Sequence, residues 1–410
     1  MSDHKNVNKS AWSERSGGPP FPNDRAGVNI QQATGYKAFI PKALPPEPPF
    51  RLDPDLVGIL SEADRALGKL DGLASLIPDP GLFVYLYVRK EALLSSQIEG
   101  TQCSLEDILG EAEATEAQAP DGAPGSHDVE EVSNYVAAMN QGLARLKDFP
   151  VSSRLIREMH AVLLQGVRGS AKTPGEFRRS QNWIGRPGAT VATADFVPPP
   201  PHEVDRCMGE LEAYIHTLDG TPPLIKAALV HAQFETIHPF LDGNGRLGRL
   251  LITFLLCGWN VIERPLLYLS YYFKAYRTEY YSRLMGIRMR GDWESWVRFF
   301  LLGVKETATL AAITAREIIA LHAKDRATLQ QADPAPIVIR VYEQFCRYPV
   351  LNAQRLTKMT ETSYPSVSRG LKVLGDLGIV REVTGGQRNR RYVYTEYMSL
   401  LTRDTALPVG

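Results

Sequence analysis

The sequence predicts a mainly α-helical protein: a helical bundle with one β-hairpin, followed by a small domain of three helices and a two-stranded wing. Three observations support this prediction. Apolar residues recur at three- and four-residue spacing over most of residues 129–323, as in amphipathic helices. Residues 182–197 instead combine turn-forming and strand-forming residues. Residues 336–402 change in character and are rich in Lys and Arg.

The composition limits the class of protein. The chain has 410 residues, which at roughly 150 residues per domain suggests two or three domains. Its 44% hydrophobic and 22% charged residues exclude a wholly disordered protein. Its 46 Lys and Arg balance 46 Asp and Glu, which excludes a chain that is basic throughout but leaves room for local basic faces.

The cysteines and the hydropathy of the chain indicate the cellular compartment in which the protein is expected. The chain has four cysteines without a CxxC pair, so we expect reduced, mostly buried thiols and neither a disulfide framework nor a zinc site. The most apolar run, residues 250–262, contains Gly258 and Asn260 and is too short and too interrupted to cross a bilayer. We therefore expect a soluble, cytoplasmic protein without a membrane segment.

The chain divides into four regions. We expect residues 1–43 to form a flexible tail, because the first 29 residues have no apolar core and are rich in Asn, Ser, Gly and Pro. Residues 44–128 form an N-terminal helical segment that includes a helix at 82–99. Residues 129–323 form the central domain and residues 334–402 the C-terminal domain. Helices in the central domain are expected at 129–147, 153–167, 202–219, 222–237, 244–259, 274–288 and 293–321.

The C-terminal region predicts a winged helix-turn-helix domain. Helices at 337–347, 353–359 and 363–374 precede a hairpin made of residues 379–383 and 392–395. Ten basic and five acidic residues give a charge of 10 − 5 = +5, which suits DNA phosphates. Such domains also mediate protein contacts or homodimers, and the sequence favours neither role. The candidate DNA-binding residues are Ser366, Arg369 and Lys372 on the third helix and Arg388, Arg390 and Arg391 on the wing.

The densest chemistry lies in the segment His-Pro-Phe-Leu-Asp-Gly-Asn-Gly-Arg-Leu-Gly-Arg, which begins at His238. Its Gly-Asn-Gly, residues 243–245, stands where a loop becomes an apolar helix, so helix N–H groups can approach an anion closely. Arg246 and Arg249 project near the same helix start. Asp242 suits Mg²⁺ shared with phosphates, and His238 can accept a proton near neutral pH. Each feature alone is common in turns and on helix surfaces, but together they predict transfer of a nucleotide phosphate group.

This segment resembles the signature of Fic-domain proteins, His-Pro-Phe-x-Asp-Gly-Asn-Gly-Arg-x-x-Arg, which is complete here. The resemblance extends over residues 129–302 and the helix at 82–99. It implies transfer of AMP from ATP to a Ser, Thr or Tyr hydroxyl of a target protein. It also implies that His238 is the catalytic base and that Asp242 holds Mg²⁺. The ATP-binding residues that it implies are Gly243, Asn244, Gly245, Arg246, Leu247, Gly248 and Arg249, with Tyr276 near the adenosine.

Further features concern the reaction and the target. The kinase-like Doc branch of this superfamily carries Lys where this chain has Gly245, so the glycine favours AMP transfer. Tyr276 departs from the family pattern, since relatives often carry Asn there. The predicted hairpin at 182–197 resembles the family's flap, whose free strand edge can pair with an extended target segment. The implied target-binding residues are Asn182, Trp183, Ile184 and Gly185.

The helix at 82–99 ends in a second motif. Ser95 and Glu99 lie one turn apart on one face, and Gly100 follows them. Alone, this is an ordinary solvated helix end, but it resembles the Fic inhibitory motif, Ser/Thr-x-x-x-Glu-Gly/Asn. The resemblance implies that Glu99 contacts Arg249 and blocks productive ATP binding within the same chain.

The sequence is compatible with three functions. The leading hypothesis is a self-inhibited protein adenylyltransferase that uses ATP and Mg²⁺. The second is a DNA-binding regulator whose Fic core only senses nucleotide. The third is a bifunctional enzyme that also removes AMP, with Glu99 as the base.

Overall fold

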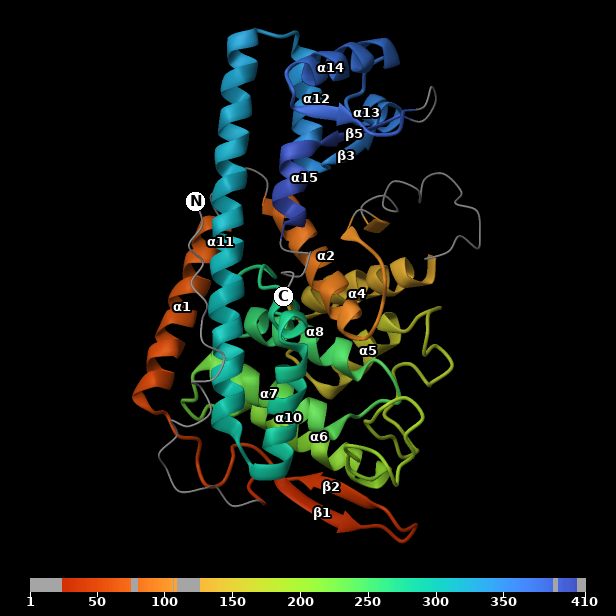
Figure 1. The fold of residues 1–410 in the computed structure, drawn as a ribbon, viewed down its shortest axis with the longest axis vertical. Helices are drawn as coiled ribbons and strands as arrows, with labels where there is room; N and C mark the ends of the chain where they lie inside the picture. The colour runs from red at the N-terminus through yellow and green to blue at the C-terminus, as the bar shows by residue number, and fades with distance from the viewer. Residues whose placement is uncertain (1–23, 75–79, 106, 109–125, 386–389, 404–410) are drawn as a thin grey trace.

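The computed structural model describes residues 24–74, 80–105, 107–108, 126–385 and 390–403, and these residues are mainly α-helical, as predicted. A helical bundle occupies one end of the molecule and the C-terminal domain the other (Figure 1). Helix α11 (Trp293–Ala332) runs along both, and α1 (Pro54–Ala74) packs lengthwise against it. The helix predicted at 293–321 therefore continues to Ala332 and forms the connection to the C-terminal domain.

The central bundle surrounds one fully buried helix. Every residue of α7 from Leu224 to Ile237 is buried, because this helix packs against α6, α8, α10 and α11, and its few polar side chains are buried with it. The predicted helix at 274–288 is divided at Tyr276, whose φ of −111° and ψ of 41° leave the helical region. The helices of the bundle are α2 (Pro80–Ile98), α4 (Ser126–Arg145), α5 (Ser153–Leu163), α6 (Pro201–His216), α7 (Pro223–Ile237), α8 (Asn244–Gly258), α9 (Ser270–Ala275) and α10 (Arg277–Arg290).

The predicted flexible tail, residues 1–43, is wrong for the part that the structure describes. Strands β1 (Gly27–Gln31) and β2 (Lys37–Pro41) form an antiparallel hairpin. The backbone N–H of Phe39 donates to the carbonyl of Val197 at 2.9 Å, and the Phe39 ring packs on Phe196. Contacts with a distant part of the chain stabilise this hairpin, and local composition does not reveal them. Residues 1–23 lie outside the described residues.

The predicted β-hairpin at 182–197 is also corrected. A single antiparallel bridge joins Ile184 and Phe196 through two hydrogen bonds, and the residues between them form turns. Pro187 and Gly188, whose φ is 84°, interrupt strand pairing immediately after the bridge. The flap is therefore a loop closed at its base rather than a two-stranded ribbon.

The described part of the C-terminal domain contains four helices and a three-stranded antiparallel sheet in the order β3-β5-β4. The three predicted helices and both predicted strands are present, while β3 and α15 add to the prediction. Helix α15 packs against α11. Arg388 lies outside the described residues. The elements are α12 (Pro336–Arg347), β3 (Val350–Asn352), α13 (Ala353–Met359), α14 (Tyr364–Asp376), β4 (Val380–Glu382), β5 (Arg391–Tyr394) and α15 (Thr395–Thr402).

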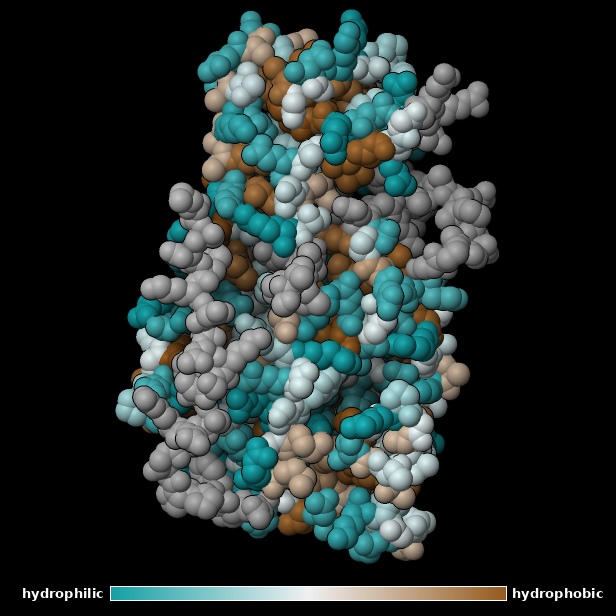
Figure 2. All heavy atoms as spheres, viewed as in Figure 1, coloured by the Kyte–Doolittle hydropathy of each residue, from teal (hydrophilic) through white to brown (hydrophobic). Residues whose placement is uncertain are grey.

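Hydrophilic and hydrophobic residues are mixed on the face of the molecule shown in Figure 2. Within the described part of the chain, no helix combines the length and apolar character that a membrane span requires.

Candidate active site

The site begins where α7 ends. His238 caps this helix in the left-handed conformation, with φ 49° and ψ 60°. Its carbonyl accepts hydrogen bonds from Arg178 Nε at 2.9 Å and from Asn182 Nδ2 at 3.1 Å. Asn182, predicted to belong to the flap, therefore fixes the loop that carries the histidine, and a buried arginine holds the same loop from the other side.

The loop between the two helices is closed by side chains. Asn244 Oδ1 accepts from the Phe240 N–H at 2.9 Å, and Asn244 Nδ2 donates to the Phe240 carbonyl at 2.8 Å. Phe240 stacks on His160, whose Nε2 lies 3.0 Å from the carbonyl of Asp242. The side-chain amide of Asn244 is hydrogen-bonded within this loop. Only the backbone of Asn244 is therefore available for the predicted phosphate contact.

Helix α8 starts without a side-chain cap. Gly243 occupies the N-cap position with a φ of 74°, and the first N–H groups of a helix have no partner within it. A Cβ atom at Gly245 would lie only 2.3 Å from Glu99 Oε1. The Glu99 carboxylate thus rests directly on the helix start, in the place where helix N-termini bind anions.

Arg249 joins the inhibitory motif to this helix start. Its Nε donates to Ser95 Oγ at 2.9 Å, and its Nη2 donates to the Ser95 carbonyl at 3.0 Å and to Glu99 Oε1 at 2.8 Å. Burial opposes the charged form of Glu99, but Arg249 outweighs it and lowers the pKa of that carboxyl. Gly100, with a φ of 101°, ends this segment in a turn.

Arg246 is buried beside two acids. Its Nη1 lies 3.4 Å from Glu131 Oε2, and its Nη2 lies 3.8 Å from Asp242 Oδ1. Thr101 donates to the same Glu131 carboxylate at 2.9 Å, and Arg168 lies 3.5 Å from its other oxygen. Glu131 and Thr101 could not be predicted from the sequence, because neither stands in a motif and the fold alone brings them to Arg246.

Asp242 suits the role of a magnesium ligand. Its Oδ1 accepts from the Gly243 N–H at 2.7 Å, and its Oδ2 lies 3.4 Å from Lys172 Nζ, while its side chain is 24% exposed. No cluster of three or more His, Cys, Asp or Glu side chains forms a metal site among the described residues. One accessible carboxylate beside an anion site fits Mg²⁺, which keeps water ligands and shares substrate phosphates.

His238 is the group that can accept a proton. Its side chain is 20% exposed. Burial, together with the guanidiniums of Arg288 and Arg178, lowers its pKa to about 3. The imidazole is therefore neutral at pH 7.

Three predicted ATP-binding positions, Leu247, Gly248 and Tyr276, remain predictions. The Leu247 side chain is buried in the hydrophobic core, and Gly248 packs against Glu235 and Phe234 of α7, so neither presents a side chain at the helix start. Tyr276 is 44% exposed and packs on Tyr272, which leaves its adenosine contact a prediction.

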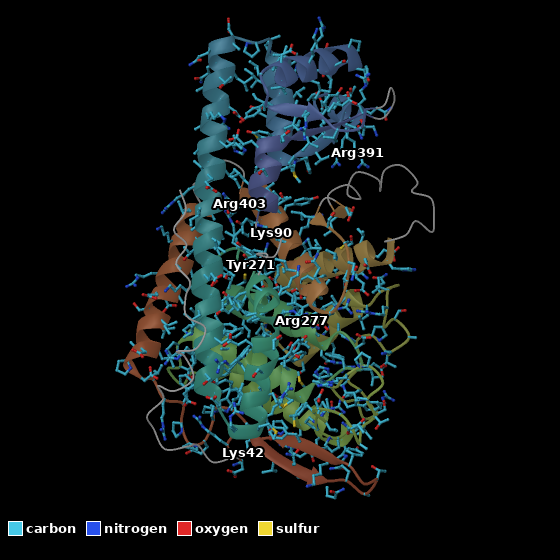
Figure 3. The ribbon with its side chains drawn as sticks, viewed as in Figure 1. Lys42, Lys90, Tyr271, Arg277, Arg391 and Arg403 are labelled. Atoms are coloured by element: carbon cyan, nitrogen blue, oxygen red, sulfur yellow. The ribbon has the colours of Figure 1, made fainter. Side chains whose placement is uncertain are left out.

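Neighbouring residues extend the site toward α10. Arg277 (Figure 3) donates from Nε to the carbonyl of Ile98 at 3.2 Å and lies over the Tyr281 ring. Glu99 and Arg249 both influence the pKa of Tyr281, which burial raises to about 12. Tyr281 therefore lies near the inhibitory pair, and its ring is 40% exposed.

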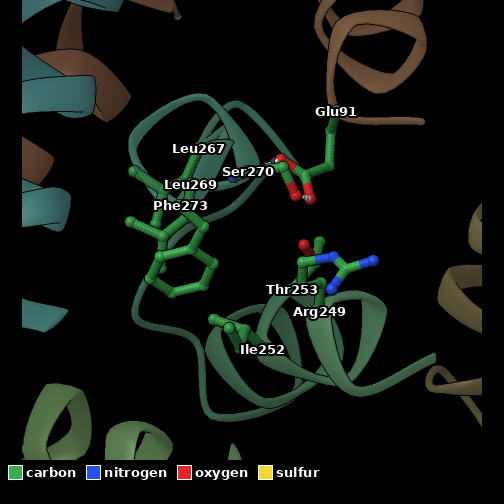
Figure 4. Close-up of a pocket in the computed structure, with 8 residues that line it drawn as sticks. All are labelled: Glu91, Arg249, Ile252, Thr253, Leu267, Leu269, Ser270 and Phe273. Carbon is green, nitrogen blue, oxygen red and sulfur yellow. Dashed lines mark hydrogen bonds between the residues drawn. The ribbon is translucent and has the colours of Figure 1, made fainter. Parts of the chain in front are cut away.

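A small cavity of about 10 Å³ lies behind Arg249, between α2, α8 and α9 (Figure 4). Glu91 accepts from the Ser270 N–H at 3.1 Å and from the Ser270 hydroxyl, and burial raises its pKa. Glu91 and Ser95 are four residues apart and lie on one face of α2, and Glu99 follows at the same spacing in the turn after the helix. This face attaches α2 to the core.

Comparison with known proteins agrees with the motif. Residues 57–144 match the family model described as Fic/DOC family N-terminal, and residues 150–256 match the model described as Fic/DOC family. The two matches lie one after the other in the chain and include the helix at residues 80–98 and the segment that begins at His238.

Individual relatives point the same way. The chain is 32% identical over 140 residues to a protein adenylyltransferase Fic from Drosophila grimshawi, which covers 33% of this chain and 25% of that protein. It is 32% identical over 176 residues to the protein of the same name from Aedes aegypti, which covers 41% of this chain and 31% of that protein. The match thus spans about a quarter to a third of these relatives.

A solved structure is similar over most of the chain. A Fic family protein from Desulfovibrio desulfuricans G20 superposes with a TM-score of 0.54 at 20% identity, covering 85% of this chain and 98% of that one. At this identity the similarity concerns the fold alone.

Proposed function

We propose that this protein is an adenylyltransferase that transfers AMP from ATP to a hydroxyl side chain of a target protein. One observation carries the proposal: a carboxylate lies on the start of α8, against Gly245 and Arg249, with Asp242 and His238 on the loop that leads into the same helix. A site that holds a carboxylate in this way suits a phosphate group.

The roles follow from chemistry. The target hydroxyl oxygen attacks the α-phosphorus of ATP, its proton passes to His238, and pyrophosphate leaves. Arg246 and Arg249 bind the β- and γ-phosphates and offset the charge that develops on the leaving group. Mg²⁺ held by Asp242 supplies further positive charge beside the phosphates.

In this proposal Glu99 inhibits productive ATP binding. The Glu99 carboxylate accepts a hydrogen bond from Arg249 and fills the space over Gly245. ATP must therefore displace this carboxylate before its γ-phosphate can bind there. The inhibitory helix and the catalytic helix belong to one chain, so inhibition is intramolecular.

The flap at residues 182–185 is the proposed target-binding edge. Its bridge between Ile184 and Phe196 leaves Trp183 43% exposed beside it. An extended segment of the target pairs with this edge and presents its hydroxyl to His238.

DNA binding through the C-terminal domain is the second candidate. Ser366 is partly exposed, and Arg369 and Lys372 are exposed, along helix α14, the third helix of the domain, while Arg390 and Arg391 stand at the start of β5. This row of basic residues suits phosphate contacts from a recognition helix. AMP removal is the third candidate and requires Glu99, partly exposed next to the nucleotide site, to activate water.

Labelling of a cell lysate tests the proposed function. The Glu99→Gly variant is incubated with lysate and ATP labelled in the α-phosphate, and modified residues are located by mass spectrometry. We expect adenylylated hydroxyl side chains in the reaction with Glu99→Gly and none with Glu99→Gly/His238→Ala. No labelling by either variant would contradict AMP transfer.

A further inference from the structure

A second acid lies next to the proposed base. Glu235 precedes His238 by three residues on α7, is 6% exposed, and places its Oε2 3.9 Å from His238 Nδ1. Neither Glu235 Oε1 nor His238 Nδ1 has a hydrogen-bond partner in the described part of the molecule. Buried polar atoms without partners are costly, so their presence on two neighbouring side chains calls for an explanation.

The neighbouring helix leaves room for this acid. A Cβ atom at Gly248 of α8 would lie 2.5 Å from Glu235 Oε1, so any larger residue would displace the carboxyl. The Glu235 backbone carbonyl, the other acceptor near the imidazole, already accepts from Arg288 Nη2 at 2.9 Å. A carbonyl oxygen can accept two hydrogen bonds, so the backbone carbonyl and the side-chain carboxylate of Glu235 are the two acceptors beside Nδ1.

Charged groups from three helices face this pair. Arg249 of α8 and Arg288 of α10 favour the ionised carboxylate, whereas Glu99, in the turn directly after α2, opposes it. Burial is the largest effect and raises the pKa of Glu235 to about 7. The Glu99→Gly variant without nucleotide lacks this opposing charge, which favours ionisation of Glu235. Arg178, Tyr280 and Tyr281 complete the titratable and charged neighbours of the two side chains.

We propose that Glu235 is a positioning residue for His238: its carboxylate accepts the Nδ1–H hydrogen bond and leaves Nε2 unprotonated, aimed at the target hydroxyl. This inference rests on the proposed AMP transfer for its consequence in catalysis, but not for its geometry. A movement of about 1 Å, within reach of side-chain rotation, shortens the 3.9 Å separation to a hydrogen bond.

A hydrogen bond between Glu235 and His238 would make His238 a more effective base. Burial leaves His238 a weak base, and an acceptor at Nδ1 fixes the tautomer and stabilises the imidazolium that forms when the target proton arrives. An acid that holds a histidine base in this way acts through it and does not touch the substrate.

The tautomer of His238 tests the geometry without any activity measurement. The full chain carrying Glu99→Gly is labelled with ¹⁵N-histidine and studied at pH 8 by long-range ¹H–¹⁵N NMR, with the His238 signals assigned by their loss in His238→Ala. We expect the Nδ1–H tautomer, and we expect Glu235→Leu to shift His238 to the Nε2–H form that free imidazole side chains favour. An unchanged tautomer in Glu235→Leu would overturn the proposal, whether or not the protein transfers AMP.

Kinetics test the consequence. In the Glu99→Gly background, Glu235→Gln should lower kcat about tenfold or more with little change in the KM for ATP, a fraction of what a general base contributes. The wild-type carboxyl should also make the rate fall as pH drops through about 7, where Glu235 takes up a proton, and the Gln variant should lack this fall.

Two controls separate positioning from structure. Glu210→Gln changes an exposed glutamate that pairs with Arg206 and should leave the pH profile unchanged. Thermal unfolding shows whether Glu235→Gln folds normally. A Gln variant with the parental kcat and pH profile would refute the positioning role, whereas failure of all variants to transfer AMP would refute the proposed function and leave the NMR result to decide the geometry.

Discussion

Replacing Glu99 with glycine is the sharpest perturbation of this site. The carboxylate forms a 2.8 Å charge-assisted hydrogen bond with Arg249, whose side chain is 2% exposed. Such a bond contributes about 1.5–3 kcal/mol, and about 1.4 kcal/mol corresponds to a factor of ten in equilibrium. Because Glu99 is 32% exposed and screened by water, the lower end of this range applies. We therefore expect about a tenfold gain in competent ATP binding.

The assay is the initial rate of AMP incorporation at ATP concentrations well below KM. Glu99→Gly should raise this rate about tenfold, and Glu99→Gln should raise it less, because the amide still occupies the space over Gly245. Ser95→Ala removes only the acceptor of Arg249 Nε and should have the smallest effect.

A double variant tests the mechanism of this gain. Arg249→Ala removes the γ-phosphate ligand together with the partner of Glu99, so Glu99→Gly/Arg249→Ala should be as inactive as Arg249→Ala. Equal rates of wild type and Glu99→Gly below KM would refute the inhibitory role, and a double variant as fast as Glu99→Gly would refute the role of Arg249.

Further predictions concern single positions. His238→Ala should bind ATP normally but lose transfer by about 10²–10⁴-fold, as measured by calorimetry and labelling. Asp242→Asn should reduce transfer and recover partly at high Mg²⁺ in a metal titration. Gly248→Ala should destabilise the protein by about 1–3 kcal/mol in urea unfolding, because its Cβ would lie 2.5 Å from a buried carboxylate oxygen. Arg369→Ala/Lys372→Ala should weaken retention of the full chain on DNA at low salt, and absence of retention by the wild type would indicate a protein-interaction domain instead.

The helical bundle could be predicted because its helices carry strong apolar periodicity. The helix at residues 223–237 and the helix at 244–258 were expected within one residue of their observed bounds. The hairpin at residues 27–41 could not be predicted, since contacts with Phe196 and Val197 stabilise it. The opposite error occurred at residues 182–197, where turn and strand composition suggested regular pairing that Pro187 and Gly188 interrupt.

The candidate site also contains residues that could be predicted and residues that could not. The motif beginning at His238 could be predicted because consecutive residues of one loop and the helix after it carry its chemistry. The contact of Glu99 with Arg249 followed from a resemblance and is present in the structure. Glu131 and Glu235 were not expected, because a buried acid within a helix has no sequence signal until the fold reveals its neighbours.

The measurement that tests the central claim most directly is a paired labelling of one target with ATP labelled in the α- or the γ-phosphate. With Glu99→Gly we expect the α-label to enter the target and the γ-label to leave with pyrophosphate, while Glu99→Gly/His238→Ala transfers neither. Entry of the γ-label would show phosphate transfer instead of AMP transfer, and equal α-labelling by both variants would remove His238 from the mechanism.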